Sequence, residues 1–342
     1  MNPYLYSPDV VRVTLVVGVL VSMLFYERLQ LTTGGAIVPA YLALALLAPL
    51  TVILTVAAGV LTHLIVDRGI TRRRILYGRR KFELEVLVGL ALVGSVFVLR
   101  GVWGQLGPWD LTVGTVGFLV PGIIAHDMSR QGIHNTLMAI LATTAILGTF
   151  LYVYVELLDL TNAQVAPPEV LASVLGYDRR LLLVAVAASV LIGMALFARL
   201  GLRSGGFITA AYLALLIDRW WDLAFILVVA VLTWAVVAKL MMPRLLLFGR
   251  RKLSTMVLFG ALIGSTAELV ARGMSDGLWE PVRGLTVMTV MLPALIANDA
   301  QRQGWERTLW GVGLGTLGVF SVTNLVAALL LGTGLLSPAV FG

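Results

Sequence analysis

The sequence predicts an all-α polytopic integral membrane protein built from two parallel tandem repeats. Three observations support this fold class. The 342 residues are 59% hydrophobic and only 13% charged, whereas a soluble globular chain carries about 25% charged residues. Apolar segments of about 13 to 25 residues recur along the chain, a length that suits helices crossing a hydrocarbon layer about 30 Å thick. The chain also matches itself at an offset of 171 to 172 residues.

The first repeat contains apolar segments at about 10–27, 35–48, 50–67, 83–100, 112–127 and 134–158. The segments 35–48 and 112–127 are short, as are their counterparts at 206–218 and 284–299. We predict that the short segments are strongly tilted spans or broken, re-entrant half-helices, which leaves four to six membrane segments per repeat. Such paired breaks point to a site within a membrane protein. The predicted breaks lie at Gly34, Gly35, Pro39, Pro121, Gly205, Gly206 and Pro293.

The duplication rests on stretches that align in order. "GGAIVPAYLALALL" at 34–47 and "GGFITAAYLALLID" at 205–218 agree at eight of 14 positions. "PGIIAHDMSRQG" at 121–132 and "PALIANDAQRQG" at 293–304 agree at seven of 12. The one long polar, Pro-containing stretch reads as a linker. We therefore predict a first membrane repeat at 1–159, an extracytoplasmic linker at 160–180 and a second membrane repeat at 181–342.

The distribution of basic residues predicts the orientation. Six crossings per repeat put the loops around 28–33, 68–82 and 128–133 on one side, which then collects 18 of the 25 basic residues. By the positive-inside rule this side is cytoplasmic, and an even number of crossings makes the repeats parallel. With only four spans per repeat, the 68–82 loop stays cytoplasmic, but Arg28 and Arg130 move outside and the charge bias weakens.

The composition supplies no evident catalytic or metal site. The absence of cysteine excludes disulfides, thiolate ligands and a cysteine nucleophile. His63, His126 and His134 show no metal-ligand spacing, and the last two are replaced by Asn298 and Glu306 in the second repeat. No GxxxxGK[ST] phosphate loop is present. We predict no catalytic residue, no metal and no cofactor, and we assign no chemistry to the histidines.

Two groups of polar residues recur in both repeats. The basic triplets of "LYGRRKF" and "LFGRRKL" either set orientation and bind lipid headgroups or form a cytoplasmic collar that docks an acidic partner or receives a polyanion. The Asp-Arg-Gln sets after the short segments either form ion pairs near a Gly helix stop or clamp a carboxylate. These candidates are Arg79, Arg80, Lys81, Arg250, Arg251, Lys252, Asp127, Arg130, Gln131, Asp299, Arg302 and Gln303.

The motifs "GGAIVPAYLAL", "ILYGRRKFE" and "VPGIIAHDMSRQG", in this order and at these separations, resemble the membrane subunit of poly-γ-glutamate synthase, the PgsC/CapC family of capsule biosynthesis. A typical member corresponds to one repeat, so this chain looks like a tandem fusion. The resemblance implies a non-catalytic, multi-pass subunit of the bacterial cytoplasmic membrane. Its implied partners are a cytoplasmic ATP-dependent amide ligase, a membrane-anchored export subunit, the lipid bilayer and anionic poly-γ-glutamate, but no nucleic acid.

The second repeat departs from the family pattern. The acidic-basic pair Glu27-Arg28 after the first helix becomes Ala198-Arg199. This pair is either an interfacial ion pair or a ligase contact. Ala210 and Ala294 stand at the positions of Pro39 and Gly122. The first repeat is therefore more similar to the family, and the two halves are expected to be specialised.

Other function classes remain open on the residues alone. A free-standing secondary transporter with parallel repeats would place sites at the broken helices. Ion coupling is disfavoured because the acidic candidates within apolar runs, Glu27, Glu156 and Glu268, fall towards segment ends. An intramembrane enzyme lacks a visible nucleophile-base arrangement. The first hypothesis, a synthase subunit that anchors the ligase and helps pass the polymer across the membrane, is preferred because of the three ordered motifs.

Overall fold

A computed structural model describes residues 6–72, 78–103, 117–161, 179–275, 279–282 and 286–333. Within these ranges the regular structure is helical and no strand is present. The chain divides into two compact units, Met1–Pro168 (unit 1) and Glu169–Gly342 (unit 2). Of the predicted linker at 160–180, residues 162–178 lie outside the described residues.

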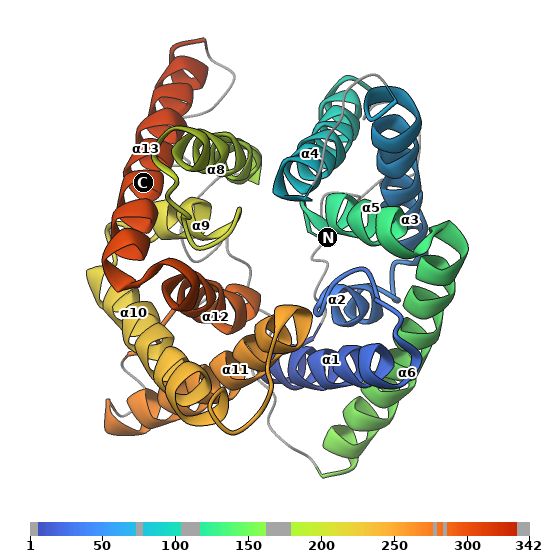
Figure 1. Cartoon of the computed structure of the whole chain (residues 1–342), viewed down its shortest axis with the longest axis vertical. Helices are drawn as coiled ribbons and strands as arrows, with labels where there is room; N and C mark the ends of the chain where they lie inside the picture. The colour runs from blue at the N-terminus through green and yellow to red at the C-terminus, as the bar shows by residue number, and fades with distance from the viewer. Residues whose placement is uncertain are drawn as a thin grey trace. The chain divides into compact units, whose positions relative to one another are not determined.

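Both units present the same series of elements (Figure 1). Unit 1 contains α1 (Pro8–Leu29), α2 (Val38–Leu44), α3 (Pro49–His63), the π-helix η1 (Leu64–Ile70), α4 (Gly78–Trp103), α5 (Val120–Gln131) and α6 (Ile133–Leu160). Unit 2 contains α8 (Arg179–Leu200), α9 (Thr209–Leu215), α10 (Trp220–Trp234), the π-helix η3 (Ala235–Met241), α11 (Gly249–Met274), α12 (Thr286–Gln303) and α13 (Trp305–Gly332). The tandem duplication predicted from the sequence is therefore present in the fold.

Many of these helices can cross a membrane. Among the described residues, seven are long and apolar enough: Pro8–Leu29, Pro49–Ile70, Ile133–Leu160, Leu181–Leu200, Trp220–Met241, Gly249–Met274 and Trp305–Gly332. Their side chains are largely unburied within the units, and exposed leucines such as Leu141 and Leu325 stand on α6 and α13. Apolar surface of this kind suits contact with lipid.

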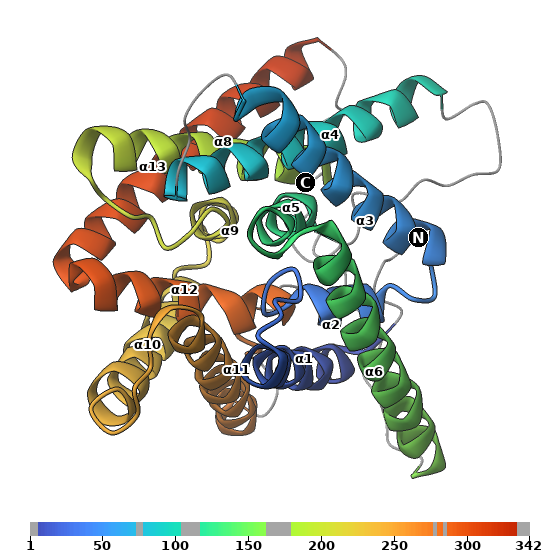
Figure 2. The same ribbon diagram turned by 45° about the vertical axis from the view of Figure 1, so that its right-hand side comes forward.

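The helices of each unit pack in two groups. In unit 1, α5 packs against α3 and α4, while α2 packs against α1 and α6 (Figure 1 and Figure 2). In unit 2, α12 packs against α10 and α11, while α9 packs against α8 and α13. The short helices α2, α5 and α9 are thus covered by longer ones, which lets irregular backbone lie at membrane depth.

The segment around α2 runs back along α6. Helix α2 has seven residues and rises only about 10 Å, so it cannot cross a membrane alone. However, Thr32 is bonded to Gln131, just before α6, whereas Leu46 packs onto Gly148. The distance from the start of α6 to Gly148 is about 22 Å along the helix. A loop and a half-helix together therefore extend over a length that is most of the roughly 30 Å thickness of a hydrocarbon layer.

Helix α5 is the second half-helix of unit 1. Its first turn lies against Gly89, well inside α4, and its last turn reaches Glu85 and the end of α3. Consequently, the end of α1, the end of η1, the starts of α4 and α6, and the end of α5 meet at one end of the unit. We call this the charged end. The geometry matches the predicted grouping of the loops around 28–33, 68–82 and 128–133.

Two details differ from the sequence-based expectation. The basic triplets were placed in loops, but they occupy the first turns of α4 and α11. The preceding Gly78 and Gly249 have φ of 57° and 56°, a conformation that favours glycine. Pro293 was expected to break a helix, but it lies inside α12. Its counterpart Pro121 does stand at a helix start, after Gly117 with φ of 118°.

Cysteine labelling tests this topology, since the chain has no cysteine of its own. We expect single cysteines at the exposed positions Leu29 and Arg80 to react with an impermeant maleimide from the same side of the membrane. A cysteine at Leu160, at the far end of α6 and 77% exposed, should react from the opposite side. Labelling of positions 29 and 80 from opposite sides would contradict the crossing by α2.

Glycine allows a close approach in unit 1 that unit 2 does not have. A Cβ built on Gly122 would lie 2.6 Å from Val86 Cα, a backbone atom. In unit 2 the equivalent Ala294 already carries a Cβ, which faces Gly260. Helices α4 and α5 therefore come closer together than a side chain at position 122 permits.

We expect Gly122→Ala to lower the free energy of unfolding by about 1 to 3 kcal/mol, because the backbones of α4 and α5 must separate. The reverse change in unit 2, Ala294→Gly, should cost about 1 kcal/mol or less. Denaturant unfolding of the purified chain in detergent measures both. Equal losses for the two variants would show that the close approach has no energetic role.

Candidate functional site

A glutamine at the end of the half-helix holds the loop that follows the first helix. Gln131 Nε2 donates to Thr32 O at 2.5 Å, and Thr32 N donates to Gln131 Oε1 at 2.8 Å. The same amide nitrogen donates to Thr136 Oγ1 at 3.0 Å. We call this arrangement the amide clamp. Gly132, with φ of 86°, ends α5 as predicted and lets α6 begin at once.

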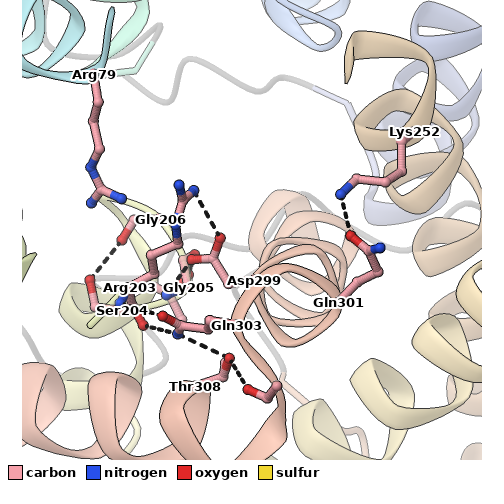
Figure 3. A network of polar contacts seen from close by, with 12 residues as sticks. Arg79, Arg203, Ser204, Gly205, Gly206, Lys252, Asp299, Gln301, Gln303 and Thr308 are labelled. Atoms are coloured by element: carbon pink, nitrogen blue, oxygen red, sulfur yellow. Dashed lines mark hydrogen bonds and ion pairs between the residues drawn. The ribbon is translucent and has the colours of Figure 1, made fainter. Parts of the chain in front are cut away.

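Unit 2 repeats the amide clamp with the same geometry. Gln303 Nε2 donates to Arg203 O at 2.9 Å and to Thr308 Oγ1 at 3.1 Å, while Arg203 N donates to Gln303 Oε1 at 3.0 Å (Figure 3). Gln131 and Gln303 belong to the sets predicted either to form ion pairs near a helix stop or to clamp a carboxylate. Their amides support the loop that precedes each short helix.

The Gly-Gly pairs form the turn that follows the clamped residue in each unit. Gly34, Gly35, Gly205 and Gly206 all have φ between 75° and 113°, which explains why glycine recurs there. In unit 2, Gly205 N donates to Asp299 Oδ2 at 3.1 Å, and Arg203 Nη1 lies 3.8 Å from Asp299 Oδ1 (Figure 3). The aspartate predicted to pair within its own helix therefore holds a distant turn.

The basic triplet of unit 1 is matched by acids. Arg79 Nε donates to Glu83 Oε1 at 2.7 Å, and Lys81 Nζ lies 2.5 Å from Asp67 Oδ1. Asp127 is fully buried nearby on α5. Cations at a helix start are disfavoured by the helix dipole, and these carboxylates offset that cost.

Unit 2 keeps the cations but lacks Asp67, Glu83 and a third acid of this end, Glu85. At the positions of Asp67, Glu83 and Glu85 it has Ala238, Ser254 and Met256. The consequence is a more positive charged end in unit 2.

A group of cations at the charged end of unit 2 follows from this exchange. Lys252 Nζ donates to Gln301 Oε1 (Figure 3), and its ammonium group lies within electrostatic reach of Arg203, Arg302 and Asp299. The three cations outnumber the one carboxylate among these groups. We call Arg203, Lys252 and Arg302 the cation cluster. Such an excess of positive charge in a partly desolvated position favours anion binding.

Unit 1 has a titratable cluster that sequence reasoning missed. Buried Glu85 accepts from Ser129 Oγ at 2.7 Å and lies 2.7 Å from His126 Nδ1. Ser129 Oγ also contacts His63 Nδ1 at 3.2 Å and Asp67 Oδ1 at 3.4 Å. A comparison of the two repeats could have pointed to this cluster, because all five of its residues differ between the units. At these positions unit 2 has Trp234, Ala238, Met256, Asn298 and Gln301.

Other predicted residues lie exposed at the charged ends. They are Glu27, Arg28, Arg80 and Arg130 in unit 1, and Arg251 and Arg302 in unit 2. Arg28 stands in the last turn of α1, where a cation interacts favourably with the helix dipole. Arg250 is partly buried in the first turn of α11. Among the described residues, no group of three or more His, Asp or Glu could hold a metal ion.

We expect Gln131→Ala and Gln303→Ala each to lower the free energy of unfolding by about 1 to 3 kcal/mol, because the backbone of Thr32 or Arg203 loses its partner. Asn135→Ala is the matched control. Its amide donates to Gln131 O at 3.1 Å in an exposed position, so a change within about 0.5 kcal/mol is expected. Thermal melting in detergent measures all three. Unaltered melting of both glutamine variants would show that the clamp is dispensable.

Comparison with known proteins gives matches over both halves of the chain. The family described as capsule biosynthesis CapC matches residues 17–137 and again 188–309. "PGA biosynthesis protein CapC" of Bacillus subtilis (strain 168) is 31% identical over 143 residues, which cover 42% of this chain and 93% of that protein. "Capsule biosynthesis protein CapC" of Bacillus anthracis is 34% identical over 143 residues, which cover 40% of this chain and 93% of that protein. No solved structure matches the chain.

Proposed function

Because this chain belongs to the capsule biosynthesis CapC family, we propose that it is a non-catalytic membrane subunit of a poly-γ-glutamate synthase complex. One observation carries the proposal: a relative named for PGA biosynthesis aligns with this chain over 93% of the relative's own length. The family match occurs once in each half. The chain therefore supplies two such subunits joined in one polypeptide.

The charged ends are the proposed meeting place with the cytoplasmic ATP-dependent amide ligase and its product. Poly-γ-glutamate carries one free carboxylate per residue, so a basic surface attracts it. We assign polymer contact first to the cation cluster of unit 2, Arg203, Lys252 and Arg302, because the other two cations lie within electrostatic reach of Lys252 and the three outnumber the carboxylate of Asp299. We assign partner or polymer contact also to the exposed Arg28, Arg80, Arg130 and Arg251.

Two features support a binding role for the triplet of unit 2 over a purely topogenic one. Cations in the first turn of a helix are opposed by the dipole, and this triplet occupies that position where Ala238 and Ser254 replace the acids that offset the cost in unit 1. Lys252 is also only 7% exposed, and burying a cation costs free energy that an orientation signal does not require. An anionic ligand would offset both costs.

A free-standing secondary transporter is the second candidate. The half-helices α2 and α5 in unit 1 favour it, because broken helices form the substrate sites of many transporters. The two candidates differ in their need for a ligase. The synthase subunit acts on polymer only together with the enzyme that makes it, whereas a transporter moves a preformed substrate alone.

Co-expression of the chain with a candidate amide ligase tests the proposal. We expect the two proteins to co-purify from membranes, and polymer formation from glutamate and ATP to require both. Lys252→Met should reduce polymer formation about tenfold, the equivalent of one lost charged contact. Lys239→Met is the matched control, since Lys239 is exposed on η3 and packs over Trp234.

The control variant should retain polymer formation within about twofold of the wild type. Absence of ligase from the purified membranes, together with unchanged polymer formation without this chain, would overturn the proposed function. Movement of preformed polymer into liposomes by this chain alone would favour the transporter.

A further inference from the structure

The titratable cluster of unit 1 is connected from an exposed edge to a buried carboxylate. Asp67, with a side chain 32% exposed, lies 3.4 Å from Ser129 Oγ. Ser129 in turn donates to Glu85, which is fully buried, and Glu85 lies 2.7 Å from His126 Nδ1. The His126 side chain is 25% exposed. A continuous row of exchangeable groups thus enters the unit at Asp67 and ends at His126.

The contact between Glu85 and His126 requires a hydrogen on one of the two groups. A hydroxyl group carries one hydrogen, so Ser129 can donate to only one acceptor at a time. Glu85 therefore receives at most one hydrogen bond from Ser129, and its 2.7 Å contact with His126 needs a hydrogen on the carboxyl group or on His126 Nδ1, which one neutral tautomer of the ring also carries. A buried carboxylate without a partner is strongly disfavoured. An added proton on the His126 ring makes its contact with Glu85 an ion pair.

The charged groups around this pair come from three directions. Helix α3 and η1 contribute His63 and Asp67, and α4 contributes Lys81, which pairs with Asp67. Helix α5 contributes His126 itself, flanked in sequence by Asp127 and Arg130. The ring of Phe82 packs against the His126 ring, with 4.5 Å between the ring centroids.

Unit 2 shows that the fold does not require these groups. It retains the amide clamp, the π-helix and the packing of α12 between α10 and α11. Yet Met256 replaces the buried Glu85, Asn298 replaces His126 and Ala238 replaces Asp67. A costly buried acid kept in one half of a duplicated fold, with an apolar residue in the other, indicates a role other than stability.

We propose that Glu85 and His126 form a proton-binding site found in unit 1 and not in unit 2, which links the action of this chain to proton concentration at the charged end. A proton arriving at Asp67 is passed to Ser129 as the Ser129 hydroxyl gives its own proton to Glu85, and Glu85 shares that proton with His126. Each uptake adds one proton to the cluster, and each release returns one. The site itself stands on geometry alone; its effect on polymer handling rests on the proposed function.

Nitrogen NMR of histidine rings tests the site directly, because the chain has only three histidines. The full chain is labelled with ¹⁵N-histidine in lipid nanodiscs, and signals are assigned by single histidine variants. We expect Glu85→Gln, which keeps the shape of the side chain, to shift the Nδ1 signal of His126, because the carboxylate that shares its hydrogen is lost. The exposed His134 should not respond. An unchanged His126 signal, in a variant that melts like the wild type, would overturn the proposal.

The pH profile of polymer formation in ligase-containing membranes tests the link to function. We expect the profile to flatten in Glu85→Gln and in His126→Asn, the residue that unit 2 uses, and to persist in the control His134→Asn. Flattening separates a proton-linked role from a structural one, which would lower the yield equally at every pH. Identical profiles in all variants would refute the link. If polymer formation never depends on this chain, the proposed function fails, while the NMR result still decides the proton site.

Discussion

The amide clamp is the contact on which each unit depends. It joins the loop after the first long helix to the end of α5 in unit 1 and of α12 in unit 2, two segments that are 99 residues apart in unit 1 and 100 in unit 2. Backbone groups in that loop have no helical partners, and lipid cannot supply any. By satisfying both groups of one residue, a single glutamine lets the loop enter the unit and continue into the short helix. The charged end is assembled around this junction.

The two units use one scaffold for different electrostatic environments. Unit 1 surrounds its triplet with carboxylates and histidines, whereas unit 2 replaces the acids by Ala238, Ser254 and Met256 and adds Arg203 beside Asp299. The two halves of a fused pair can differ, so the proposed attraction of an anion and the proposed exchange of a proton fall to different units. The fusion also fixes the ratio of the two kinds of half at one to one.

The sequence predicted what is local or repeated, and missed what is assembled across helices. The apolar segments, the duplication and the glycine turns are visible because each is encoded within a few neighbouring residues. The cluster around Glu85 is not, because Ser129 lies 44 residues from Glu85 and 66 from His63. The triplets were assigned to loops because their charge disfavours a helix start. Pro293 was assigned to a break because proline lacks an N–H donor and tends to interrupt helices. The structure keeps it inside α12, since membrane helices can retain a proline.

The π-helices η1 and η3 indicate which features of this chain preceded its duplication and which arose after it. They occupy equivalent positions, Leu64–Ile70 and Ala235–Met241, although their sequences, LIVDRGI and AVVAKLM, differ at every position but one. A feature shared by both copies at the same register is most simply inherited from the single ancestral gene. The widened turn is therefore older than the duplication, and the difference between Asp67 and Ala238 on it is younger. Divergence changed the side chains that line an already existing distortion and left its backbone intact.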